Sequence, residues 1–128
     1  MVKEHCLFCD RNNTERHKII VENELFYARE DNFAVSKGHT EVVPKKHVES
    51  FFDFTDEEAV QLFDLIKKTK NIISKKYKPD GFNIGINEGE AAGRSIHHLH
   101  VHIIPRYIGD IENPRGGIRH IIPGKGNY

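Results

Sequence analysis

A short stretch of the sequence, GRSIHHLHVHIIPRY, alternates histidines with apolar residues. The histidines are His98, His100 and His102. Because side chains point alternately to the two sides of a strand, the pattern predicts three imidazoles on one face and apolar side chains on the other, against the core. Clustered imidazoles can bind a transition metal, attack as nucleophiles or donate hydrogen bonds to an anion such as phosphate. A polar strand face that happens to be rich in histidine is the weaker interpretation, because chance rarely places three at a period of two.

The segment just before the histidines, NEGEAAGRS, favours an anion over a bare metal. It combines small residues, which let backbone amides approach a ligand, with polar donors. The residues concerned are Asn87, Gly93, Arg94 and Ser95. An arginine and a hydroxyl beside imidazoles suit a phosphate group. The two motifs together therefore predict a phosphate-binding site.

Four motifs, CLFC, KGHTEVVPKKH, NEGEAAGRS and HLHVHIIPRY, resemble the histidine triad family in type and order. The family signature is His-φ-His-φ-His-φ-φ, with φ apolar, and residues 98–104 match it at every position. The resemblance implies an α+β subunit with a five-stranded antiparallel sheet, one long helix and one short helix. It also implies a homodimer with a continuous ten-stranded sheet. The implied activity is hydrolysis or transfer at the α-phosphate of a purine nucleotide or dinucleoside polyphosphate.

The resemblance assigns roles around the phosphate. His100 would attack the α-phosphorus and form a covalent nucleotidyl-histidine, which water then hydrolyses. His98 and His102 would hold the phosphate or orient its neighbours. Asn87 and Ser95 match positions that contact phosphate. Displacement of this kind depends more on positioning and charge neutralisation than on acid–base strength.

The nucleoside end of the ligand can be placed in the same way. Asp31 matches an acidic or amide residue of the family that binds ribose hydroxyls, and a carboxylate can accept from two vicinal hydroxyls. His39 resembles a pocket histidine of the family, although a structural hydrogen-bonding role fits it equally well. The candidates for an apolar slot that holds the base are Phe8, Phe26, Phe33 and Val43. For each phenylalanine, packing in the core is the alternative.

Arg94 departs from the family pattern, in which many members have glutamine after Ala-Gly. A glutamine can hydrogen-bond the leaving-group oxygen, whereas arginine brings a full positive charge. We expect Arg94 to favour a charged polyphosphate leaving group over a neutral amine.

The two cysteines, Cys6 and Cys9, are spaced like half of a tetrahedral zinc site. In some bacterial members of the family such a site is completed by two histidines, which correspond here to His47 and His98. The resemblance thus implies a structural zinc ion that attaches the N-terminal segment to the sheet. Two reduced, partly buried thiols are the alternative.

The elements that position these residues can be predicted from local signals. Strands are expected near 18–21 and 24–29, with Glu22-Asn23-Glu24 as the turn between them. Further strands are expected within 39–47, stopped by Pro44, and near 82–89 and 98–105. Thr55 and Glu58 form a capping box at the start of a long helix, whose apolar positions are Ala59, Leu62, Phe63, Ile66 and Ile73. The tail over 109–128 is rich in glycine and proline and is expected to be irregular. Strands without intervening helices, plus one long helix, favour an α+β domain with an antiparallel sheet.

Length and composition limit the alternatives. The 128 residues suit one domain over 1–128. Positive and negative residues balance at 19 each, which disfavours nucleic acid and membrane surfaces as partners. The chain contains no long apolar run and no signal-peptide core at its start, and the isolated CxxC pair fits a cytoplasmic protein.

The favoured prediction is an enzyme of the diadenosine polyphosphate hydrolase kind. An adenosine phosphoramidase and a dinucleoside polyphosphate phosphorylase are alternatives within the same chemistry. A non-catalytic nucleotide-binding module belongs to another class, and the intact His100 argues against it. A metal-dependent oxygenase is disfavoured by the sequence, because no carboxylate close to the histidines in sequence completes a facial triad.

Overall fold

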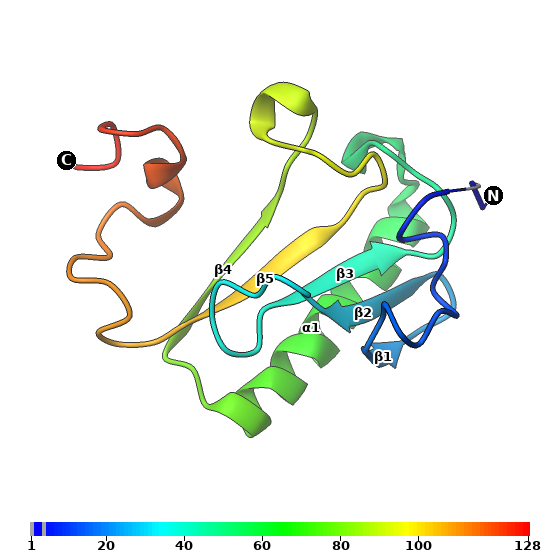
Figure 1. Cartoon of the computed structure of the whole chain (residues 1–128), viewed down its shortest axis with the longest axis horizontal. Coiled ribbons are helices and arrows are strands. Elements are labelled where there is room, and N and C mark those ends of the chain that lie inside the picture. The colour runs from blue at the N-terminus through cyan, green and yellow to red at the C-terminus, as the bar shows by residue number, and fades with distance from the viewer. Residues whose placement is uncertain (1, 4) are drawn as a thin grey trace.

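Five antiparallel strands form one sheet in the order β1-β2-β3-β5-β4 (Figure 1). The computed structural model describes residues 2, 3 and 5–128. The strands are β1 Ile19–Glu22, β2 Phe26–Glu30, β3 Thr40–Pro44, β4 Gly81–Ile86 and β5 Val101–Arg106. The α+β prediction with a five-stranded antiparallel sheet is confirmed.

The turn between β1 and β2 is built around Asn23, as the sequence predicts. The Asn23 side-chain oxygen accepts hydrogen bonds from the backbone N–H groups of Leu25 and Phe26, at 3.2 and 2.9 Å. An asparagine that satisfies the amides two and three residues ahead mimics a backbone turn. The two strands therefore meet as a hairpin, with β2 starting two residues later than expected.

One long helix, α1 (Asp56–Tyr77), follows the predicted capping box. Thr55 accepts from the backbone N–H of Glu58, and the Glu58 carboxylate accepts from the backbone N–H of Thr55. The buried line of the helix differs from the prediction and consists of Leu62, Leu65, Thr69 and Ile73. Ala59 and Phe63 are exposed. Periodicity alone allows two neighbouring stripes, and contact with the strands decides which stripe is buried.

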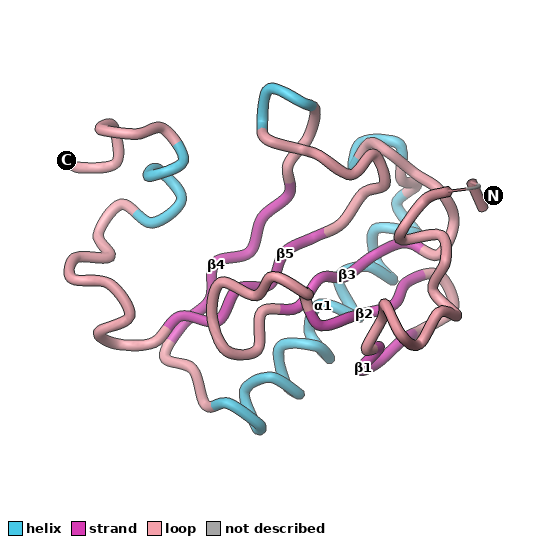
Figure 2. Tube along the Cα trace, viewed as in Figure 1, coloured by secondary structure: helices cyan, strands magenta, loops and turns pink. Residues whose placement is uncertain are grey.

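The described part of the chain contains no second α-helix beside α1. Its short helices are three 3-10 helices, where one short helix was expected (Figure 2). They are Phe51–Asp53, Glu90–Ala92 and Gly117–Ile121.

The two faces of the sheet are covered differently. α1 lies against one face and closes the main core, formed by Phe26, Ala28, Val42, Leu62, Leu65, Ile73, Val101 and Ile103. On the other side, Phe8 from the N-terminal segment packs with Tyr27 and Val43. This second face is only partly covered, and it carries the polar side chains described below.

The strand that carries the histidines is shorter than predicted. β5 begins at Val101, so only His102 lies in the ladder, and His98 and His100 come before it. The chain bends over 96–98, and the backbone N–H of Leu99 donates to the Val48 carbonyl at 2.6 Å. The expectation of three imidazoles along one strand is therefore wrong for His98 and His100, which precede β5, and His98 is also fully buried.

Beyond β5 the chain runs away from the sheet on the side of β4 (Figure 1). The predicted irregular tail is confirmed, with Gly117–Ile121 as its one 3-10 turn among the described residues. Within the part of the chain that the structure describes, no helix combines the length and the apolar character needed to cross a membrane.

Candidate functional site

A cavity of about 320 Å³ opens on the second face of the sheet, in front of the end of the histidine motif. It brings together nine residues that the sequence singles out. They are Phe8, Asp31, Phe33, His39, Asn87, Gly93, Ser95, His100 and His102. They come from the N-terminal segment, the β2–β3 connection, the segment after β4, and β5 with the residue just before it.

Four predicted residues lie outside this cavity. Phe26 belongs to the main core and Val43 packs with Phe8 and Tyr27, so neither can contact a base. His98 is buried in a separate cluster of cysteines and histidines. Arg94 is the fourth.

Arg94 is held by Glu49. Its guanidinium donates to the Glu49 carbonyl at 2.8 Å and lies 3.8 Å from the Glu49 carboxylate. The flanking residues Gly93 and Ser95 line the cavity, whereas the arginine does not. The positive charge expected at the leaving group is therefore not in the cavity.

We expect Arg94→Gln to leave the ratio of polyphosphate to phosphoramidate cleavage unchanged, because the charge that it removes is already paired with Glu49. Rates on the two substrate types, measured side by side for both proteins, check this. A clear shift of the ratio toward the phosphoramidate would show that Arg94 acts on the leaving group after all.

The His100 ring is oriented by the backbone. Its Nδ1 lies 2.9 Å from the His98 carbonyl oxygen. A carbonyl can only accept, so Nδ1 carries the ring proton and Nε2 keeps its lone pair. Burial lowers the pKa of His100, which favours this neutral form. The neutral His100 ring thus offers a nucleophilic nitrogen, and His100 lines the cavity.

His102 has the opposite tautomer, set by a chain of hydrogen bonds. The backbone N–H of Val35 donates to His39 Nδ1 at 3.2 Å, so His39 carries its proton on Nε2. His39 Nε2 lies 2.9 Å from His102 Nδ1 and donates to it. His102 therefore has its proton on Nε2. Burial, with smaller contributions from His100 and His39, lowers the pKa of His102 to about 4, which keeps the ring neutral.

Asp31 lies beside these rings. One carboxylate oxygen accepts from the backbone N–H of Phe33 at 2.8 Å. The other is 3.4 Å from His39 Nε2 and 3.9 Å from His102 Nδ1. The carboxylate lines the cavity with lone pairs left for a ligand hydroxyl.

A carboxylate does lie beside the histidines in the structure, contrary to the expectation from the sequence. Asp31, His39 and His102 gather in the arrangement of two histidines and one carboxylate that the sequence does not predict. The hydrogen bonds nevertheless oppose a facial triad. His39 accepts on Nδ1 and holds a proton on Nε2, so its neutral ring has no lone pair for a metal.

A second cluster fits a metal. Cys6, Cys9, His47 and His98 each offer one ligand atom, and these four atoms lie within 4.8 Å of one another. His98 Nδ1 is 3.2 and 3.4 Å from the two sulfurs, and His47 Nδ1 is 3.5 Å from Cys9 Sγ. Bonds of about 2.0 Å to nitrogen and 2.3 Å to sulfur place tetrahedral ligands about 3.3–3.8 Å apart. The two thiols and two imidazoles therefore suit a tetrahedral ion such as zinc.

The outer contact of His98 supports the same use. Its Nε2 donates to the Pro44 carbonyl at 2.8 Å, which leaves the Nδ1 lone pair directed at the sulfurs. Ligand histidines usually make a hydrogen bond of this kind with the other nitrogen. Both nitrogens of His98 are thus engaged away from the cavity, and it cannot hold a phosphate there.

Two charged residues of the cavity were not identified from the sequence. Arg29 and Glu41 line the cavity, are almost fully buried and form an ion pair. The available signal was an arginine and a glutamate in two strands rich in apolar residues, but their partnership depends on strand register.

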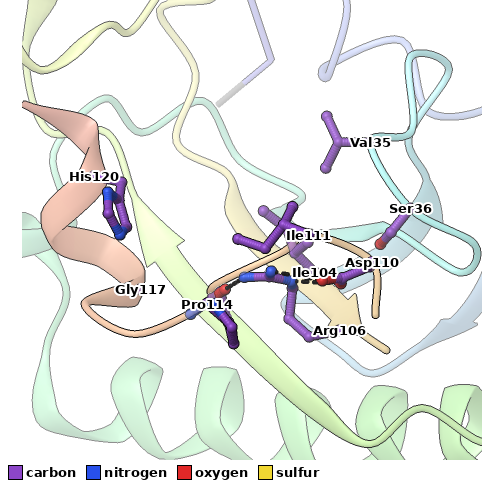
Figure 3. Close-up of a pocket in the computed structure, with 10 residues that line it drawn as sticks. Val35, Ser36, Ile104, Arg106, Asp110, Ile111, Pro114, Gly117 and His120 are labelled. Carbon is purple, nitrogen blue, oxygen red and sulfur yellow. Dashed lines mark hydrogen bonds and ion pairs between the residues drawn. The ribbon is translucent and has the colours of Figure 1, made fainter. Parts of the chain in front are cut away.

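A neighbouring cavity of about 370 Å³ lies between β4, β5 and the C-terminal segment (Figure 3). Its arginine, Arg106, is bound by Asp110 at 2.8 and 2.9 Å, as the dashed lines in Figure 3 show. Arg106 also donates to the Asn83 side chain at 2.7 Å. Because the Arg106 guanidinium is already paired with Asp110 and Asn83, it is not available to bind a ligand in this second cavity.

Comparison with known proteins identifies relatives over most of the chain. A family model described as "HIT domain" matches residues 12–109. "Protein hit" of Bacillus subtilis is 42% identical over 106 residues, which are 81% of this chain and 72% of that protein. "AP-4-A phosphorylase" of Mycobacterium tuberculosis is 37% identical over 75% of this chain and 50% of its own length. "Bis(5'-adenosyl)-triphosphatase" of Dictyostelium discoideum is 34% identical over 74% of this chain and 68% of its own.

Solved structures match in the same way. A HIT family protein from Bacillus anthracis has a TM-score of 0.75 at 38% identity, covering 81% of this chain and 74% of that one. A Zn-bound histidine triad family protein from Mycobacterium smegmatis has a TM-score of 0.72 at 30% identity, covering 83% and 78%.

Proposed function

The chain belongs to the histidine triad (HIT) family, and on that premise we propose that it cleaves adenosine-containing phosphoanhydrides at the α-phosphate through a covalent nucleotidyl-His100 intermediate. The observation that carries this proposal is the protonation of two of the histidines that line the cavity, His100 and His102. His100 presents an unprotonated Nε2, and neighbouring His102 carries a proton on its own Nε2. A nucleophile beside a hydrogen-bond donor is what in-line attack on a phosphate needs.

The proposed reaction has two steps. His100 Nε2 bonds to the α-phosphorus as the bond to the leaving-group oxygen breaks, and that oxygen leaves with the electron pair. His102 Nε2–H donates to a phosphoryl oxygen, and Ser95 and Asn87 line the same cavity. Water then attacks the phosphorus from the side that the leaving group vacated, the P–N bond breaks, and AMP is released as the water loses a proton.

The relatives' names support a dinucleoside polyphosphate as substrate. One is an AP-4-A phosphorylase and one a bis(5'-adenosyl)-triphosphatase, so phosphate and water are both candidate acceptors. An adenosine phosphoramidase is the second candidate. The position of Arg94 favours it, because no positive charge from that residue enters the cavity to select a polyphosphate leaving group.

We further propose that Cys6, Cys9, His47 and His98 hold a structural zinc ion, which when bound would connect the N-terminal segment to the segment just after β3 and to the histidine motif. The donor geometry and the Zn-bound relative support this proposal. Because His98 also supplies the carbonyl that orients His100, the ion would help to fix the nucleophile.

We also propose that the protein is a cytoplasmic homodimer with no nucleic-acid or membrane partner. β4 is an edge strand, and apolar side chains stand exposed next to it and on the C-terminal segment. They include Ile84, Ile108, Ile121 and Ile122. A second copy of the chain could cover such a surface.

The function is tested by incubating the protein with adenosine dinucleotides and with an AMP amidate, in the presence and absence of inorganic phosphate. AMP release from the dinucleotides supports the hydrolase, and ADP formation in phosphate supports the phosphorylase. Faster release from the amidate would favour the phosphoramidase. Binding without turnover of any substrate would leave a nucleotide-binding module and contradict the enzyme.

Asp31→Asn is expected to weaken AMP binding by about tenfold or more, because a carboxylate accepts hydroxyl hydrogen bonds more strongly than an amide does. Calorimetry with AMP and 2′-deoxy-AMP measures this, and the loss should be smaller for the deoxynucleotide. Glu30→Gln is the matched control. Glu30 pairs with Lys18 at 3.5 Å and does not line the cavity, so AMP affinity should stay at the wild-type level. Equal losses for both ligands would refute ribose recognition by Asp31.

A further inference from the structure

A buried ion pair forms part of the cavity wall. Arg29 and Glu41 are 2% and 4% exposed, and an Arg29 N–H donates to one Glu41 carboxylate oxygen at 2.5 Å. The two residues face each other across β2 and β3, and His102 faces Glu41 from β5. A row of cross-strand partners thus runs from the arginine through the glutamate to the histidine.

Stability alone does not explain this pair. Removing two charges from water costs free energy that their attraction often fails to recover, and apolar side chains of similar size frequently serve as well. The arginine is held by further contacts: it donates to the Arg16 carbonyl at 3.1 Å and lies 5.3 Å from the centre of the Phe8 ring. That phenyl ring packs in turn against His100, with ring centres 5.0 Å apart.

The second Glu41 oxygen faces the reacting groups. It lies 4.0 Å from His100 Nε2 and 4.0 Å from His102 Nδ1. Neither distance is a hydrogen bond, so this oxygen is not committed to either ring. A carboxylate oxygen is therefore held close to the nitrogen that the proposed reaction uses.

The chemistry gives this charge a task. When His100 Nε2 forms its bond to phosphorus, Nδ1 keeps the proton that the His98 carbonyl accepts, so the ring becomes a cation. Resting on the proposed function, we infer that Glu41 is a charge-compensating residue, whose carboxylate stabilises the cationic His100 ring of the nucleotidyl intermediate while Arg29 holds that carboxylate in place. No further reactant is needed, because the P–N bond forms as the leaving group departs with its electron pair.

The electrostatic surroundings of Glu41 are consistent with this role. Burial, followed by the Asp31 carboxylate, raises the pKa of Glu41 to about 7, and Arg29 opposes that rise. The ionised carboxylate is thus poorly stabilised in the free protein. It becomes more stable when a second positive charge forms on the ring nitrogen 4.0 Å away.

The test compares two adenosine ligands, of which only the second is expected to form a bond to His100. AMP occupies the cavity without a P–N bond. Vanadate esterifies the 5′ hydroxyl of adenosine, and its vanadium accepts a fifth ligand from the histidine. We expect Glu41→Gln to weaken adenosine–vanadate binding about 10- to 100-fold, the size expected for a partly screened charge pair at this distance. Affinity for AMP should stay close to wild type. AMP release should become slower through a lower kcat, with KM little changed.

A double variant separates this role from a structural one. Glu41→Gln alone leaves Arg29 as an uncompensated buried cation and can impair folding. Arg29→Gln with Glu41→Gln removes both charges and should restore thermal stability. If Glu41 compensates the His100 charge, the double variant still binds adenosine–vanadate weakly. If Glu41 only neutralises Arg29, the double variant regains wild-type affinity, and the inference is overturned.

The remaining outcomes are also decisive. Equal weakening of AMP and adenosine–vanadate by Glu41→Gln overturns the inference and leaves the proposed function intact, provided that the wild-type protein releases AMP. If wild-type protein and His100→Ala bind adenosine–vanadate equally and neither releases AMP, the proposed function fails, and the role of Glu41 fails with it.

Discussion

Replacing His100 with alanine is expected to abolish AMP release from every substrate that the wild-type protein cleaves. The ring supplies the attacking lone pair. Among the described cavity histidines, His39 and His102 each have an unprotonated Nδ1 that already accepts a hydrogen bond, so neither offers a free lone pair. Loss of a catalytic nucleophile costs about 10⁴-fold or more in rate. Chromatography of the products at saturating substrate measures the effect.

Two controls separate chemistry from folding in this experiment. His97→Ala removes a neighbouring imidazole that pairs with Glu90 at 3.8 Å and lies outside the cavity, so activity should persist. AMP binding and the thermal midpoint of His100→Ala should remain near wild type. A folded His100→Ala protein that retains substantial turnover would exclude the covalent mechanism.

Removal of the metal ligands is expected to have the second large effect, on stability. Cys9→Ser and His47→Ala each break the four-residue cluster, and purified protein should fall from one zinc ion per chain to far less. Metal binding contributes directly to folding free energy, so a loss on the order of 3 kcal/mol should lower the thermal midpoint by about 10 °C or more. Elemental analysis and thermal unfolding with and without a chelator measure both quantities.

His97→Ala again serves as the matched control, because it removes a histidine next to His98 without touching the cluster. It should keep its zinc and its thermal midpoint. Wild-type protein that contains well under one zinc per chain, or whose unfolding is unaffected by a chelator, would instead support the alternative of two reduced thiols.

Local signals in the sequence were sufficient for most of the fold. The Asn23 turn and the Thr55 capping box are satisfied within three residues, so they could be identified without tertiary information. The buried line of α1 could not, because the choice between Phe63 and Leu65 depends on which stripe the sheet meets. The start of β5 was placed too early for a similar reason, since Leu99 pairs with Val48 outside the sheet.

In the functional site, too, the residue pattern could be identified from the sequence, whereas the contacts that control it could not. The alternation of His100 and His102 was visible at once, but their tautomers are set by backbone atoms of His98 and Val35. The pairing of Arg94 with Glu49 joins residues 45 positions apart, and nothing near Arg94 in the sequence indicates it.

Likewise, the ion pair between Arg29 and Glu41 exists because β2 and β3 pair in one register. A shift of one residue would send the two side chains to opposite faces. Its place beside His100 could therefore be recognised only in three dimensions.

Mass spectrometry of protein quenched in base during turnover, where a P–N bond to histidine survives, is the decisive test of the covalent mechanism. One nucleotidyl group is expected on the peptide containing residues 98–102, bonded to the side chain at position 100, and the adduct should disappear as AMP forms. An adduct on a different side chain, or AMP release with no protein-bound nucleotide at any time during the reaction, would contradict it.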